Sequence, residues 1–164
     1  MLYIFISIFL DFLFSLFISS TYQNLNIFFP CIFVSCIPLV YNLLNNKKIF
    51  IVFMIFIGIV YDLLFSDIFL INTYYFLLFG LFIYVYYSKH KFNLFNIFFL
   101  SLFGVCLYDI FIFFILVLID YRTFTIFDLI YKVKNSILLN SIYILLSIIC
   151  LKSRIFRNKN SKRI

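Results

Sequence analysis

Apolar residues along this chain form six long runs, which are separated by short polar breaks. The runs cover residues 2–20, 27–44, 49 onward, 74–87, 93–119 and 135–151. About 20 apolar residues in a helix suffice to cross a hydrocarbon core about 30 Å thick. The pattern therefore predicts an all-α, polytopic integral membrane protein with about six transmembrane helices in one bundle.

The breaks between the runs differ in length. Residues 45–48 and 88–91 are short polar turns, whereas Ser66-Asp67 and Asn72-Thr73 are the only polar interruptions between the third and fourth runs. We expect a tight or re-entrant hairpin there. The longest connection, residues 120–134, is predicted to be an interfacial amphipathic segment.

Composition supports a membrane location. With 66% apolar and 12% charged residues, the 164-residue chain has more hydrophobic surface than a soluble domain of this size can bury.

The first run lacks the basic start and small-residue cleavage site of a signal peptide, so we expect a retained helix. The four cysteines lie in apolar runs without Cys-x-x-Cys spacing, which favours packing over disulfide or zinc chemistry.

Basic residues predict the orientation. In the six-span arrangement, ten Lys and Arg residues lie on one side and three on the other. Because positive residues accumulate in cytoplasmic segments, both termini are predicted to be cytoplasmic. Residues 1–151 then form the transmembrane domain, and residues 152–164 form a basic cytoplasmic tail that enforces this orientation and contacts anionic lipid.

Two aspartates within apolar runs are the main candidates for function. Asp62 follows Gly58 and Tyr61, and Asp109 follows Gly104 and Tyr108. An ionisable residue at membrane depth is costly, so it is expected to face a bundle interior or a wet cavity.

A helical rise of about 1.5 Å per residue places both aspartates and Asn140 in the outer third of the membrane. Asp11 is a third aspartate, and the intervals from Asp11 to Asp62 and on to Asp109 are 51 and 47 residues. This spacing indicates either three repeated hairpins or a chance distribution.

Catalytic motifs are not evident in the sequence. A Tyr-Asp motif is half of what intramembrane aspartyl proteases display, but Asp109 lacks their Gly-x-Gly-Asp. His-Glu-x-x-His, Walker and Gly-x-Ser-x-Gly motifs do not occur. His90, the one histidine, lies in a polar turn. We therefore predict that the protein is not an enzyme and that it has no catalytic, cofactor-binding or metal-binding residues.

The order of these features resembles the rod shape-determining protein MreD family. The resemblance includes the length, Phe29-Pro30 at the start of the second span, Gly58-x-x-x-Asp62-Leu63-x-x-Ser66, Asp109-Ile110, Asn140 and the basic tail. Where this family usually has glycines after the serine, together with a Leu-Gly, this chain has Asp67-Ile68-Phe69-Leu70.

The resemblance implies a non-enzymatic component of the bacterial cell-wall elongation machinery, located in the plasma membrane. Its implied partners are an MreC-like membrane-anchored protein, the actin-like MreB filament and peptidoglycan synthases, with no nucleic acid. The alternative is a substrate-binding membrane subunit of an energy-coupling-factor vitamin transporter, although three glycines and no alanine give little small-residue surface for an energising partner.

Four residues are the candidates for a structural or partner-coupling site, namely Asp62, Asp109, Asn140 and Gly58. The alternative for all four is hydrogen bonding between helices with no partner role.

Overall fold

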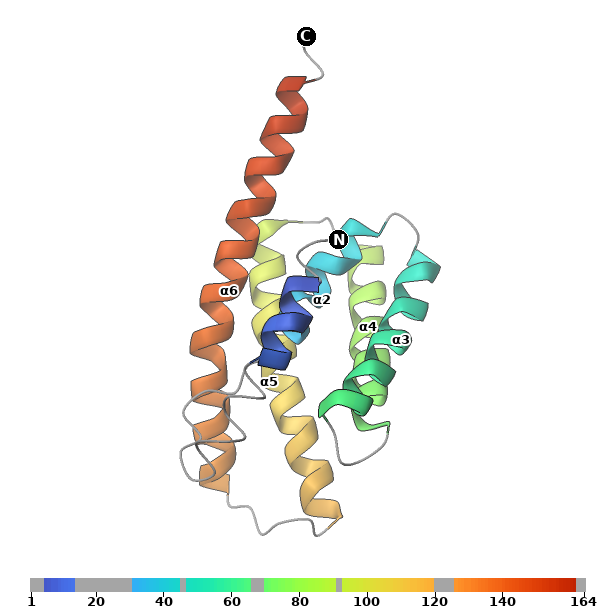
Figure 1. Cartoon of the computed structure of the whole chain (residues 1–164), viewed down its shortest axis with the longest axis vertical. Helices are drawn as coiled ribbons and strands as arrows, with labels where there is room; N and C mark the ends of the chain where they lie inside the picture. Colours follow the sequence, from blue (N-terminus) through green and yellow to red (C-terminus); the bar gives the residue numbers. More distant parts are fainter. Residues whose placement is uncertain are drawn as a thin grey trace.

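The computed structural model describes residues 5–13, 31–44, 47–65, 70–90, 93–119 and 126–161, and every regular element in these ranges is a helix (Figure 1). A helical segment at residues 5–13 comes first. It is followed by α2 (Ile32–Leu43), α3 (Lys47–Phe65), α4 (Ile71–Lys89), α5 (Leu94–Leu118) and α6 (Ile126–Ser161). The all-α prediction is confirmed for this part of the chain.

Helix α2 occupies the centre of the bundle, where it contacts α3, α4, α5 and α6 (Figure 1). Every residue from Ile32 to Val40 is buried, Pro38 included. A helix that is apolar and buried on all sides can satisfy the polar groups at its ends only through other parts of the protein. The expected start of this span, Phe29-Pro30, lies outside the described residues.

The other four helices form two antiparallel hairpins, α3 with α4 and α5 with α6 (Figure 1). The connection between α3 and α4 is short, as expected, because α3 ends at Phe65 and α4 begins at Ile71. Aromatic rings fill the space between α2 and this hairpin. Phe33 packs against Tyr61 and Phe76 at ring-centroid distances of 5.5 Å each.

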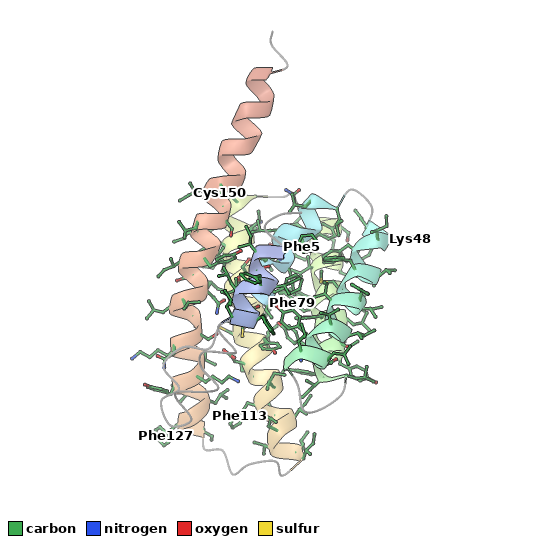
Figure 2. All side chains as sticks on the ribbon, in the orientation of Figure 1. Phe5, Lys48, Phe79, Phe113, Phe127 and Cys150 are labelled. Atoms are coloured by element: carbon green, nitrogen blue, oxygen red, sulfur yellow. The ribbon has the colours of Figure 1, made fainter. Side chains whose placement is uncertain are left out.

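Apolar side chains also cover the outer faces of the helices (Figure 2). Leu63 is 72% exposed, Phe95 65% and Ile149 62%. Two helices, Leu94–Leu118 and the Leu129–Cys150 part of α6, are long and apolar enough to cross a membrane. An apolar exterior of this kind is typical of a surface that faces hydrocarbon.

Helix α6 differs from the sequence prediction. An interfacial segment was expected up to residue 134, but α6 begins at Ile126 and continues to Ser161, so this prediction is wrong for residues 126–134. No Gly or Pro follows Gly104 to stop a helix. The helix also passes without a break through the expected boundary at residues 151 and 152, and its C-terminal end projects beyond the bundle (Figure 1). Residues 120–125 lie outside the described part of the chain.

Candidate functional site

Asp11 caps the buried start of α2. The N-cap residue, Cys31, provides no side-chain hydrogen bond to the helix. The backbone N–H groups of Ile32 and Phe33 donate instead to Asp11 Oδ1 and Oδ2, each at 2.9 Å, and the Tyr61 hydroxyl donates to Oδ2 at 2.6 Å. A carboxylate at a helix N-terminus satisfies free N–H groups and interacts favourably with the helix dipole. The first helical segment is thereby attached to α2 and α3.

Asp62 caps α4 in the same way. The N-cap residue here is Leu70, which also makes no side-chain capping bond. Asp62 Oδ1 accepts from the Asn72 N–H at 2.8 Å, while Oδ2 accepts from the N–H of Thr73 at 3.0 Å and from its hydroxyl at 2.6 Å. Asp62 is 3% exposed. Its carboxylate thus holds the α3–α4 hairpin closed from the α3 side.

Gly58 lies one helical turn before Asp62 and faces the same residue of α4. A Cβ atom at position 58 would lie 2.6 Å from the Thr73 Cα. Atoms this close overlap, so any larger side chain would push the two helices apart. Gly58 therefore allows the close approach that the Asp62 hydrogen bonds require.

The tyrosine that precedes each of Asp62 and Asp109 bonds to the previous hairpin. Tyr61 donates to Asp11, as described, and the Tyr108 hydroxyl donates to Asn72 Oδ1 at 2.7 Å. Each Tyr-Asp pair therefore has two separate roles. The aspartate contacts the next helix, and the tyrosine contacts the capping site of the hairpin before it.

Asp109 differs from the other two aspartates. It is fully buried, and its contact with the following helix is an ion pair in which Lys132 Nζ lies 3.8 Å from Oδ1. Neither carboxylate oxygen has a hydrogen-bond partner among the described residues. Ser136, one turn after Lys132 on α6, lies beside this carboxyl group.

Asn140 lies one further turn along α6 and is fully buried. Its side-chain amide donates to the carbonyl oxygen of Ser136 at 2.8 Å and to the Ser136 hydroxyl oxygen at 3.3 Å. Its own oxygen, Oδ1, accepts no hydrogen bond within the described residues. Asn140 and Asp109 therefore flank the same serine.

The structure thus places the four predicted residues in two groups. Gly58 and Asp62 meet at Thr73, whereas Asp109 and Asn140 meet at Ser136. No hydrogen bond joins Asp62 to Asp109 in the described part of the chain. The three aspartates nevertheless each contact the helix that follows, as three repeated hairpins would.

The sequence analysis missed several residues of this network. Asp11 was recognised as part of the repeat but not as a site residue, although its spacing was the available signal. Asn72-Thr73 was interpreted only as a polar interruption. Among the described residues, these two provide the three hydrogen bonds that Asp62 accepts.

Comparison with protein-family models, curated proteins and solved structures finds no match to this chain. The chemistry of the site therefore rests on its own geometry. Asp11 and Asp62 act as hydrogen-bond acceptors whose oxygens are already occupied by helix N–H groups. In the residues that the structure describes, no three His, Cys, Asp or Glu side chains come together as a metal site would require.

Asparagine substitutions should separate the capping aspartates from Asp109. We expect Asp11→Asn and Asp62→Asn each to lower the free energy of unfolding by about 1 to 3 kcal/mol, because an NH2 group replaces one acceptor oxygen and leaves a helix N–H unsatisfied. Asp109→Asn leaves no helix N–H unsatisfied and keeps an amide oxygen that can face Lys132, whose side chain is 23% exposed, so its cost should stay below about 1 kcal/mol. Unfolding of the purified proteins in one detergent and Na⁺-free buffer measures the three values. An equal loss in all three would contradict the capping roles.

Gly58→Ala should destabilise the protein more than Gly80→Ala. The added methyl group at position 58 meets the backbone of Thr73 at 2.6 Å, whereas at position 80 it meets the flexible Met54 side chain at 3.0 Å. Overpacking against atoms that cannot move costs about 1 to 3 kcal/mol. Gly80→Ala is the matched control because it also lies within a helix of the same hairpin. Equal unfolding temperatures for the two variants would show that close approach at Gly58 is not required.

Proposed function

We propose that this chain is a six-span membrane protein with cytoplasmic termini, and that it acts as a non-enzymatic component of the bacterial cell-wall elongation machinery. Its role would be that of a scaffold, similar to the MreD family. Its partners would be an MreC-like membrane-anchored protein, the MreB filament and peptidoglycan synthases.

The observation that carries this proposal is the role of the Gly58-x-x-x-Asp62 motif. These are the most specific residues of the resemblance, and both act on Thr73 to close the α3–α4 hairpin. Ser66, the last residue of the motif, lies outside the described residues, as do Asp67, Ile68 and Phe69.

Leu70 provides a second point of support. It has a φ of 70°, in the left-handed region that glycine adopts without strain. It also lies in the segment after Ser66 where the family usually has glycines together with a Leu-Gly. The chain therefore departs from the family in residue type within a segment where one residue, Leu70, still has a backbone conformation that suits glycine.

The internal contacts also favour a scaffold. The Asp11 and Asp62 carboxylates have their oxygens occupied by helix N–H groups and hydroxyls, which favours a structural role over proton transfer at these two residues. The outer faces of the helices are apolar, as a protein surrounded by lipid and by other membrane helices requires.

The six-span arrangement predicts the location of each connection. Reporter fusions placed after Lys48, after Lys91 and at the C-terminus should all report cytoplasm, because the ten-to-three distribution of basic residues favours that side. A fusion at Tyr121, in the connection between the fifth and sixth spans, should report the outside and is the matched control. An external signal from the C-terminal fusion would eliminate this topology.

Complementation and co-purification test the function itself. In rod-shaped bacteria that lack their own MreD-type protein, the wild-type chain should restore rod shape, and Asp62→Leu should give rounded cells because the α4 N–H groups lose every acceptor on Asp62. The tagged chain, purified from gently solubilised membranes, should recover wall-synthesis proteins. Recovery of ATPase subunits instead would favour the energy-coupling-factor transporter.

A further inference from the structure

The polar groups around Asp109 include buried acceptor oxygens that no described residue reaches with a hydrogen bond. Asp109 Oδ1 and Oδ2 and Asn140 Oδ1 are fully buried and have no hydrogen-bond partner among the described residues. We call these three atoms the acceptor cluster. Ser136 lies beside both side chains, because its hydroxyl oxygen accepts from the Asn140 amide and it adjoins the Asp109 carboxyl group.

Among Asp11, Asp62 and Asp109, only Asp109 has carboxylate oxygens without a hydrogen-bond partner in the described residues. The Asp11 and Asp62 oxygens each accept at least one hydrogen bond of 3.0 Å or shorter. Lys132 approaches only Oδ1 of Asp109, at 3.8 Å, which is too long for a hydrogen bond. Buried acceptors without partners are costly and rare, so each one requires an explanation.

We propose that the acceptor cluster is a binding site for a small monovalent cation, either H⁺ or Na⁺. The Ser136 hydroxyl lies beside Asp109 and carries one proton, so it can donate to only one of these oxygens. The other acceptor oxygens can be satisfied only by a further donor or by a cation, and carboxylate and amide oxygens suit a hard ion. The three atoms have almost no solvent-exposed surface, so the ion must enter without its hydration shell. A bound proton would turn Asp109 into a donor toward its acceptor neighbours, while a sodium ion would be coordinated by the same oxygens.

Several ionisable groups surround Asp109 and will affect its occupancy. The nearest cation is Lys132, whose ammonium group competes with any ion for Oδ1. Among the described residues, the other titratable groups that interact with Asp109 come from the start of α2, from α4 and from α5, and they are Cys31, Tyr75, Cys106 and Tyr108. Asp11, in the first helical segment, also acts on Cys31.

The site does not depend on the proposed cell-wall function, because it concerns only the contact of α5 with α6 and the start of α2. An ion bound there would link Asp109 on α5 to Asn140 on α6. Loss of the ion would leave the Lys132 ion pair as the polar contact between Asp109 and α6. The bound ion would therefore stabilise the α5–α6 hairpin.

The test is the unfolding temperature of the full-length protein in detergent, measured against NaCl at fixed ionic strength with choline chloride as replacement. If Na⁺ is the ligand, the unfolding temperature should rise by roughly 3 to 5 °C for each tenfold increase above the dissociation constant. If the proton is the ligand, stability should instead fall as pH rises at constant Na⁺, since the folded protein holds a proton that the unfolded chain releases.

Variants assign either response to the acceptor cluster. Asp109→Asn should abolish the response, and Asn140→Ala should weaken it. Asp62→Asn, at the fully hydrogen-bonded aspartate, is the matched control and should retain it. Lys132→Gln should increase the apparent affinity for the ion at least tenfold, because it removes the competing ammonium group.

A direct measurement on the wild-type protein tests the site even if a variant does not fold. Binding of radioactive ²²Na⁺ to the wild-type protein, or the infrared band of a protonated carboxylic acid that disappears at high pH, reports the occupant without any substitution at Asp109. A response to Na⁺ or to pH that Asp109→Asn removes and Asp62→Asn retains supports the site. The proposal is overturned if wild type and Asp109→Asn respond identically to Na⁺ and to pH, or if Lys132→Gln leaves the affinity unchanged.

Discussion

A helix that begins inside an apolar bundle leaves N–H groups without acceptors, and the rest of this structure depends on how that constraint is met. Both α2 and α4 begin with N-cap residues, Cys31 and Leu70, whose side chains make no capping bond. A carboxylate from another helical segment provides the acceptors in each case. Because α2 contacts every one of the later helices, the Asp11 cap fixes the central element around which the two hairpins pack.

Capping by a carboxylate from another helix also explains why the third hairpin differs from the first two. Asp11 and Asp62 each meet the first turn of the next helix, where free N–H groups are available. Helix α6 begins at Ile126, six residues before Lys132, so Asp109 meets the side of a helix whose N–H groups are already hydrogen-bonded. The aspartate of the third hairpin therefore meets a lysine instead of a helix start, and its oxygens have no hydrogen-bond partner among the described residues.

The helices could be predicted from the sequence to the extent that each is an apolar run with polar ends. The boundaries of α5 agree with the predicted run because polar residues flank it on both sides. The predicted last span was shorter than α6, because Lys132 and Lys134 were interpreted as the end of an interfacial segment. The candidate site was harder to predict. Sequence spacing identified the aspartates, but the donors that face Asp11 and Asp62 are backbone N–H groups, which every residue possesses and which no residue type reveals. Only the location of the helix starts shows that Asp11, Asn72 and Thr73 belong to the network.

Leu70 shows how this network permits a departure from the expected sequence pattern. A left-handed conformation costs a residue with a Cβ about 1 to 2 kcal/mol relative to the right-handed one, and a leucine at φ 70° carries that cost. Hydrogen bonds to a charged group contribute about 1.5 to 3 kcal/mol each, and Asp62 accepts three of them from Asn72 and Thr73, immediately after the turn. The capping bonds therefore outweigh the strain at Leu70, so the close contact of Gly58 with Thr73 can be kept although the chain has no glycine between Ser66 and Ile71.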